Sequence, residues 1–192
     1  MNIYELNDQE LIKAYLSGNE SALAELLSRH QRKVFTSIYV FVRDHSLAED
    51  IFQDTFVKVI ESLRAGKYSE EGKFLPWILR ISHNLCIDYY RKVKRSPKMA
   101  TADSYDIFNL IKFSDTNGEE MMMKDQTIDR VRQLIESLPD EQKEVVILRH
   151  YAELSFKEIA DITKVSINTA LGRMRYALIN MRKTVEENQI AL

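Results

Sequence analysis

Apolar residues recur at steps of three and four along most of the chain, the spacing that puts side chains on one face of an α-helix. In the run from Leu75 to Arg95 this spacing defines a packing face, which consists of Ile78, Ile81, Leu85 and Tyr89. A second stripe of the same run carries an aromatic ring, polar groups and cations, and consists of Trp77, Arg80, Asn84, Asp88 and Arg91. Bases stack on aromatic rings and phosphates attract cations, so this stripe suits nucleic acid; the alternative is a core helix with a solvated basic end.

Polar caps mark the helices that precede this run. Asn7 and Glu10 fit a capping box, in which each side chain accepts a hydrogen bond from the backbone of the other residue. Gly18 can end this first helix, and Asn19 can cap the second. The apolar positions expected at the start of the second helix are Ala22, Leu23, Leu26 and Leu27.

The run 34–42 is rich in aromatic and β-branched residues, which on propensity alone would suit a strand. Its apolar spacing and its neighbours predict a helix instead. Ser46 and Glu49 form another capping-box pattern, so a third helix is expected from Leu47 to about Leu63. The polar residues 67–73 are expected to form a loop after it.

The C-terminal part of the chain has the pattern of a helix-turn-helix. Pro139 starts a helix with acids in its first turn, and Ser155 and Glu158 form a capping box at the start of a short helix. A three-residue turn at 163–165 follows, and Ser166 caps a longer last helix. The apolar residues of this last helix are Ile167, Ala170, Met174, Ala177 and Met181.

Charge changes sign within this motif: acids dominate residues 140–161, whereas residues 162–183 carry bases and no acid. The outward side of the last helix would therefore face a polyanion, and it consists of Leu171, Gly172, Arg173, Arg175 and Tyr176. In a helix-turn-helix the second helix lies in the DNA major groove. We predict DNA binding here over the alternative of an ordinary helical hairpin with a basic end.

Residues 96–127 show no sustained apolar period and are rich in acids, with one short helical piece expected at 107–113. The fold predicted from these patterns is all-α. It has two helical domains, residues 1–96 and 128–187, joined by a flexible acidic linker at 97–127.

Composition limits the cellular location and the disulfide chemistry that we expect for this protein. The chain has 192 residues, a formal net charge of −2 and a single cysteine, Cys86, so an internal disulfide is excluded and the cytoplasm is the expected location. The N-terminus lacks the apolar run of a signal peptide, and no stretch approaches transmembrane length, so no membrane insertion is expected.

Residues suited to catalysis or metal binding are not clustered in the sequence. The four histidines are scattered, without the paired spacing of a metal site, and there is no glycine-rich phosphate loop. Asp50 and Asp54 share a helix face, which is better explained as a solvated or protein-binding acidic surface than as a carboxylate site. We expect no enzymatic activity, no cofactor and no metal.

Three stretches, 47–63, 74–92 and 138–183, make the chain resemble a bacterial RNA polymerase sigma factor of the extracytoplasmic-function (ECF) group. Their order and spacing match that family over nearly the whole chain. The third stretch alone would also fit other helix-turn-helix activators, whereas its pairing with the first two is specific. The resemblance implies a sigma region 2-like bundle, a region 4-like helix-turn-helix, and a linker threaded through the polymerase toward the RNA path.

The resemblance also implies residue roles. The surface that docks on the clamp helices of the polymerase's largest subunit would be Asp50, Gln53, Asp54 and Val57. The site that captures a flipped base of the minus-ten element would comprise the loop 67–74 and the helix beside it, with Lys67, Lys73, Phe74, Trp77, Arg80, Asn84, Asp88, Arg91 and Lys92. The minus-thirty-five element would be read by Lys164, Ser166, Asn168, Thr169, Leu171, Gly172, Arg173, Arg175 and Tyr176.

The implied partners are core RNA polymerase, including the flap of its second-largest subunit, promoter DNA, and an anti-sigma factor, which in this family is often membrane-bound. The chain departs from the family at Lys164, where glycine is usual and a left-handed backbone is expected, and at Leu171-Gly172, where a Lys-Ser pair is common. Two other functions fit the residues less well: a stand-alone activator with a ligand-sensing N-terminal domain, and a helical adaptor without DNA contact.

Overall fold

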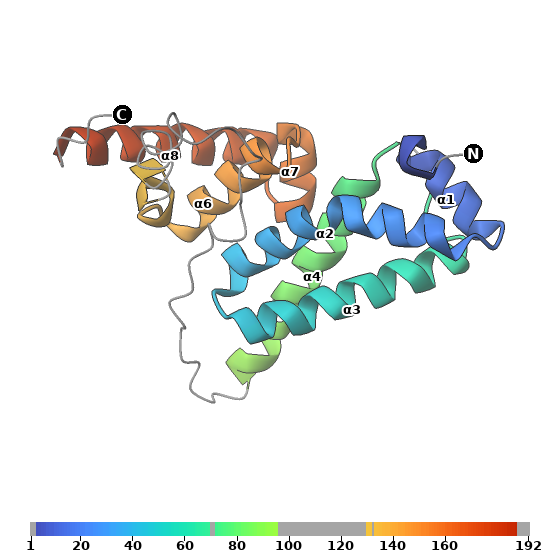
Figure 1. Ribbon diagram of the computed structural model, residues 1–192. Coiled ribbons are helices and arrows are strands. Elements are labelled where there is room, and N and C mark those ends of the chain that lie inside the picture. Colours follow the sequence, from blue (N-terminus) through green and yellow to red (C-terminus); the bar gives the residue numbers. More distant parts are fainter. Residues whose placement is uncertain (1–2, 70–71, 96–129, 132, 188–192) are drawn as a thin grey trace, which may run out of the picture. The chain divides into compact units, whose positions relative to one another are not determined.

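The computed structural model describes residues 3–69, 72–95, 130–131 and 133–187, and every regular element in these ranges is helical (Figure 1). The chain divides into two compact units, Met1–Tyr105 and Asp106–Leu192. The predicted all-α class with two helical domains is confirmed. The predicted linker and its short helical piece lie outside the described residues, and the exact domain boundaries stay a prediction.

The first unit contains a short 3-10 helix, η1 (Ile3–Glu5), and four α-helices: α1 (Asp8–Leu16), α2 (Glu20–Val42), α3 (His45–Arg64) and α4 (Phe74–Arg95). The helices α2, α3 and α4 pack against one another in pairs, and α1 lies on α2 and α3. Figure 1 shows α2 and α3 running side by side with α4 crossing them. Fully buried side chains at the centre of this bundle include Leu26, Val34, Ile38, Val59, Ile78 and Leu79.

The predicted caps of the first two helices are confirmed. The Glu10 amide donates to Asn7 Oδ1 at 3.0 Å, and the Asn7 amide donates to Glu10 Oε2 at 2.8 Å. Gly18 has a φ of +99°, a conformation that glycine adopts without steric cost, and Asn19 caps α2 through the amides of the two residues after Glu20. The run 34–42 is helical, as predicted, and continues α2 without a break.

The predicted cap of the third helix is wrong. Helix α3 begins at His45, and its cap is Asp44, whose Oδ1 accepts a hydrogen bond from the Leu47 amide at 2.9 Å. Ser46 lies inside the helix. Asp44 has the extended backbone that a cap requires, and its carboxylate also interacts favourably with the positive end of the helix dipole.

The buried face of α4 also differs from the predicted one. Ile78 is fully buried, but Ile81 and Leu85 are only half-buried and Tyr89 is exposed. The core side of the helix consists of Ile78, Leu79, Ser82, His83 and Cys86. Two of these are polar, which is why the apolar pattern misplaced the face. Ser82 Oγ donates to the Leu79 carbonyl of the same helix at 3.0 Å, and the His83 ring packs edge-on against Phe41 of α2.

In the second unit, residues 130–131 and 133–136 are helical and precede α6 (Asp140–Val146). A π-helical segment, η3 (Ile147–Tyr151), extends α6, and α7 (Phe156–Thr163) and α8 (Ile167–Glu187) follow. Buried Ala170, Met174 and Ala177 lie on α8, which packs against both α6 and α7. The predicted capping box of α7 is confirmed through Ser155 and Glu158.

The turn between α7 and α8 has the geometry expected of a helix-turn-helix. Lys164 has a φ of +57° and a ψ of +39°, so the predicted left-handed conformation is confirmed. A side chain with a Cβ pays about 1 kcal/mol or more for this conformation. Ser166 Oγ accepts a hydrogen bond from the Thr169 amide at 3.0 Å, which caps the first turn of α8.

A polar network fastens the N-terminal segment to α2. Arg29 donates through Nη1 to the Leu6 carbonyl at 2.6 Å and through Nη2 to the Tyr4 carbonyl at 3.0 Å. The next residue, His30, has its Nε2 2.7 Å from Asp8 Oδ2. The hydrogen bond from His30 lowers the pKa of the Asp8 carboxyl, and the charges of His30 and Arg29 lower it further against the opposing effect of burial.

This network predicts a loss of stability in acid. Because the folded pKa of Asp8 lies below its unfolded value of about 3.9, the stabilisation is fully present above about pH 4 and disappears as the pH falls through the folded pKa. We therefore expect Asp8→Asn to lower the melting temperature at neutral pH and to reduce its decline between about pH 4 and pH 2. Melting curves of both proteins across this range test the expectation, and parallel curves would contradict it.

Candidate functional site

One face of α3 is acidic and open to solvent. The four side chains predicted to bind core polymerase all lie on it and are all exposed; they are Asp50, Gln53, Asp54 and Val57. Their spacing of three and four residues brings them into one strip, and Val57, 54% exposed, adds an apolar contact within it. Two carboxylates and an amide around an exposed valine suit a protein partner with a basic surface.

The polar and charged residues of the second stripe of α4 are exposed, whereas Trp77 at its start is half-buried. Arg80, Asn84, Asp88, Arg91 and Lys92 are all open to solvent. Arg91 Nη1 lies 3.5 Å from Asp88 Oδ1, and both side chains are more than half exposed, so this ion pair contributes little to folding. The structure thus presents amide, carboxylate and cationic groups together on one helix face, where they remain available to nucleic acid.

An aromatic cluster lies where the loop after α3 meets the start of α4. The ring centroids are 4.6 Å apart for Tyr68 and Trp77, 5.8 Å apart for Phe74 and Trp77, and 5.7 Å apart for Tyr68 and Phe74. Phe74 is 2% exposed, whereas Tyr68 and Trp77 are half-buried. Phe74 is therefore the buried member of the cluster. Tyr68, which sequence reasoning did not single out within the loop, is partly accessible to solvent.

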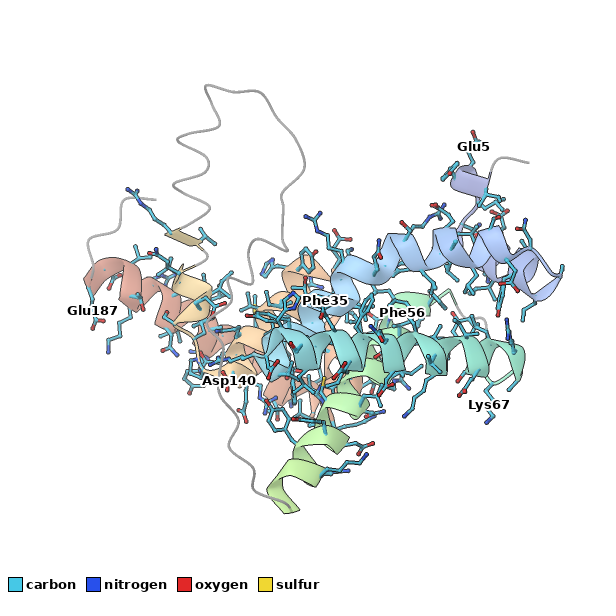
Figure 2. All side chains as sticks on the ribbon, turned by 60° about the horizontal axis from the view of Figure 1, so that its bottom comes forward. Glu5, Phe35, Phe56, Lys67, Asp140 and Glu187 are labelled. Carbon is cyan, nitrogen blue, oxygen red and sulfur yellow. The ribbon has the colours of Figure 1, made fainter. Side chains whose placement is uncertain are left out.

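The loop itself is flanked by cations. Lys67 and Lys73 are both exposed, and residues 70–71 lie outside the described part. Figure 2 shows Lys67 just beyond α3, at the end of the first unit where Glu5 and the N-terminal segment also lie. Arg64 near the end of α3 donates to the Tyr15 hydroxyl on α1 at 2.7 Å, which ties the two helices together at this end.

The first turns of α8 carry an exposed polar surface. Lys164, Ser166, Asn168 and Thr169 surround the N-terminus of the helix, and Leu171, Arg175 and Tyr176 continue the same open side. The positive end of the helix dipole adds to the lysine and arginine charges, so this surface attracts an anion. Gly172 is not required by close packing within the chain, since a Cβ built on it meets no atom within 4 Å.

Arg173 differs from its neighbours on α8. Its side chain is 20% exposed, and Nη2 lies 3.2 Å from Glu141 Oε2 in the first turn of α6. A second link joins the same helices, since Asn180 Nδ2 donates to Gln142 Oε1 at 2.8 Å. The sequence marks Glu141 only as an acid in the first turn of a helix, and nothing in the pattern indicates that it faces α8.

Two further features concern the described ranges 3–69, 72–95, 130–131 and 133–187: a metal site and a membrane-spanning helix. Among these residues, no group of three or more histidine, cysteine or acidic side chains is placed to hold a metal ion. In the same part of the chain, no helix combines the length and the apolarity needed to cross a bilayer.

A helix-turn-helix with a cationic face is typical of a DNA-binding protein. Comparison with protein families agrees: the model of sigma-70 region 2 matches residues 26–96, and that of sigma-70 region 4 matches residues 128–175. The chain belongs to the RNA polymerase sigma factors of the ECF group. Its function is therefore that of a sigma factor, which binds core RNA polymerase and directs initiation at specific promoters through their minus-ten and minus-thirty-five elements.

Individual relatives cover almost the full chain. RNA polymerase sigma factor YlaC of Bacillus subtilis is 30% identical over 178 residues, which are 90% of this chain and 99% of YlaC. The ECF RNA polymerase sigma factor SigW of the same organism is 25% identical over 187 residues, covering 95% of this chain and 99% of SigW.

Two solved structures share the fold. CnrH in complex with the cytosolic domain of CnrY matches with a TM-score of 0.61 and 22% identity, over 94% of this chain and 97% of the matched one. The sigma factor RpoE in complex with the anti-sigma factor NepR from Bartonella quintana matches with a TM-score of 0.63 and 17% identity, over 85% and 96% of the two chains.

Proposed function

We propose that the exposed surfaces of the two units divide the work of promoter recognition between them. The observation that carries this proposal is the placement of four predicted polymerase contacts on the open acidic face of α3, while the cationic and aromatic groups lie on α4 and α8. The acidic face would dock on the clamp helices of the largest polymerase subunit, and the second unit would also contact the flap of the second-largest subunit.

The first unit would open the minus-ten element. A base flipped from the non-template strand would enter the loop 67–74, next to Tyr68 and Trp77, because an unstacked base regains stacking energy on aromatic rings. Asn84 is exposed on the neighbouring helix face and has both a donor and an acceptor with which to distinguish bases. The remaining proposed contacts would bind the strand on either side, and they are Lys67, Lys73, Arg80, Asp88, Arg91 and Lys92.

Phe74 would take part in the minus-ten site through packing. Its 2% exposure leaves no surface for a base in this conformation, so a role in strand capture would be to hold the half-buried rings above it.

The second unit would read the minus-thirty-five element as duplex, with α8 in the major groove. Arg175 is exposed and free to reach a base edge or a phosphate, while Lys164, Ser166, Asn168 and Thr169 approach the backbone at the helix N-terminus. Leu171 and Tyr176 would make apolar contacts, and Gly172 would leave room for DNA between them. Arg173 would act partly through its pairing with Glu141.

The protein would work in the cytoplasm and have no catalytic activity of its own, since the polymerase performs the chemistry. An anti-sigma factor would regulate it; the two structural neighbours were solved bound to such a factor or to a cytosolic protein domain. This part of the proposal rests on the family and on those complexes.

Reconstitution with core RNA polymerase and transcription from a genomic promoter library test the proposed function. We expect transcription to begin at a small set of promoters that share minus-ten and minus-thirty-five sequences. Duplex binding without polymerase, with no effect on promoter opening, would support a stand-alone activator instead.

The docking surface predicts a specific binding defect. The double change Asp50→Ala and Asp54→Ala should weaken binding to core polymerase by about 1–2 kcal/mol, because charges at an interface set affinity and association rate whereas exposed charges add little to folding. A titration against core polymerase at moderate salt measures the loss. Glu20→Ala is a matched control, since it removes a carboxylate that is 71% exposed on α2. Equal affinity of the double variant and the control would remove this assignment.

A further inference from the structure

His30 lies where three elements of the first unit meet. It belongs to α2, its Nε2 lies 2.7 Å from Asp8 Oδ2 on α1, and its ring centroid is 5.6 Å from that of Phe74, the first residue of α4. The side chain is 14% exposed. One edge of the imidazole is thus fixed by a carboxylate, while the ring packs at 57° against a phenyl ring that is almost completely buried.

Phe74 connects this contact to the loop 67–74. Its ring touches both Tyr68 and Trp77, and those two rings are the closest pair in the cluster, at 4.6 Å. Protein interiors are close-packed, so a displacement of a buried ring is transmitted to the rings that rest on it. The orientation of the two half-buried rings beside the loop therefore depends on what holds Phe74 in place.

We propose that His30 is a positioning residue of the minus-ten capture site: Asp8 orients the imidazole, the imidazole fixes Phe74, and Phe74 sets the rings of Tyr68 and Trp77. The inference rests on the proposed function, in which a flipped base lies next to Tyr68 and Trp77. It extends the specificity-determining part of the protein to α1 and α2, which contribute none of the residues assigned to DNA so far.

The neighbouring arginine also holds the N-terminal segment. Arg29 binds the Tyr4 and Leu6 carbonyls and lies 2.7 Å from Glu25 Oε1 through Nε. These contacts fasten the segment through a guanidinium, whereas the ring contact to Phe74 is made by His30. Arg29 Nη1 also lies 3.7 Å from Asp8 Oδ1, farther than the 2.7 Å that separates His30 Nε2 from Asp8 Oδ2. Arg29→Gln serves as the control, because it loosens the same segment from α2 and retains the shorter His30–Asp8 contact and the imidazole against Phe74.

Two substitutions test the hydrogen bond of His30 to Asp8 and its ring contact with Phe74 separately. His30→Gln keeps a donor for Asp8 at a similar reach but removes the ring, whereas His30→Phe keeps a ring against Phe74 but loses the hydrogen bond to Asp8. Each full-length variant is assembled with core RNA polymerase. Binding is then measured on fork-junction templates carrying each of the four bases at the critical non-template position of the minus-ten element. Melting curves of the free proteins report folding.

We expect the wild-type holoenzyme to prefer one base and His30→Gln to lower that preference about tenfold, because misplacement of a site by a fraction of 1 Å costs this much in selective interactions. His30→Phe should lower the preference less, and Arg29→Gln should lower the melting temperature without changing the preference. If His30→Gln does not fold, His30→Phe and Asp8→Asn provide the test, with a loss of preference again expected for both.

The outcomes separate this inference from the function on which it rests. A wild-type holoenzyme without any base preference would contradict the capture site itself. A wild-type preference that the folded His30 variants retain within about twofold, below the tenfold effect expected of misplacement, would overturn the role of His30. A loss of preference as large in Arg29→Gln as in His30→Gln would mean general loosening of the bundle, and would also overturn it.

Discussion

Replacement of Arg175 by alanine is expected to weaken binding to a minus-thirty-five-dependent promoter by about 1–3 kcal/mol, a loss of roughly fivefold to 150-fold. Arg175 is exposed on the outer side of α8, close to the helix turns that enter the groove in a helix-turn-helix. A guanidinium there contacts either a base edge or a phosphate. If Arg175 contacts a base, the loss should depend on the promoter sequence. If it contacts a phosphate, the loss should be the same on every sequence, and the slope of log affinity against log salt concentration should fall in magnitude by about one.

The measurement compares holoenzymes on two templates. A duplex promoter with a minus-thirty-five element should show the defect, and a pre-melted template lacking that element should not. An equal loss on both templates would mean that Arg175 acts elsewhere than in reading the duplex.

Arg173 is expected to behave differently, because its guanidinium is already paired with Glu141 between α8 and α6. Arg173→Ala should lower both stability and promoter binding, and Glu141→Gln should reproduce much of that effect by releasing the same pair. Increased promoter binding by Glu141→Gln would contradict this expectation, because it would show that the pair holds back an arginine that contacts DNA directly.

The second large effect concerns a buried lysine. Lys143 on α6 is 1% exposed, and its Nζ lies 2.6 Å from Glu136 Oε2 and 3.0 Å from the Glu136 carbonyl, whereas the Glu136 side chain is 41% exposed. Removal of the carboxylate leaves a buried ammonium with one backbone acceptor. Glu136→Ala should therefore cost about 3 kcal/mol of stability.

The opposite change should cost much less. Lys143→Met keeps an unbranched apolar stem of similar volume in the core and leaves the Glu136 carboxylate partly in water, so we expect a loss below about 1.5 kcal/mol. The difference between the two stability losses separates the cost of an unpaired buried charge from the net contribution of the ion pair. Equal losses of stability for Glu136→Ala and Lys143→Met would contradict the interpretation that the buried ammonium depends on the Glu136 carboxylate.

Amide hydrogen exchange of the full-length chain measures these losses within α6 and α8 separately from the first unit, which matters because a chain of two units need not unfold in one step. Glu187→Ala is the control. Its carboxylate lies 3.5 Å from Lys183 Nζ at the exposed end of α8, and a surface pair of this kind contributes at most about 1 kcal/mol.

The sequence by itself determined the helical class, the first cap, the capping box of α7 and the helix-turn-helix. These features depend on local interactions: apolar spacing and the hydrogen bond of Asn7 or Ser155 to a backbone amide three residues later. The left-handed Lys164 was predictable only through the family resemblance, because glycine is usual at this turn position in the family. The acidic strip on α3 followed from spacing along a single helix.

Only the tertiary structure decided which faces are buried and which polar groups are paired. His83 lies on the core side of α4 against the Phe41 ring of α2, a contact that the pattern does not mark. Other decisive contacts join residues of different helices. They are the contacts of buried Phe74 with His30, of Arg173 with Glu141, and of His30 with Asp8. Such contacts depend on how helices pack, and helical periodicity specifies a face without specifying what lies against it.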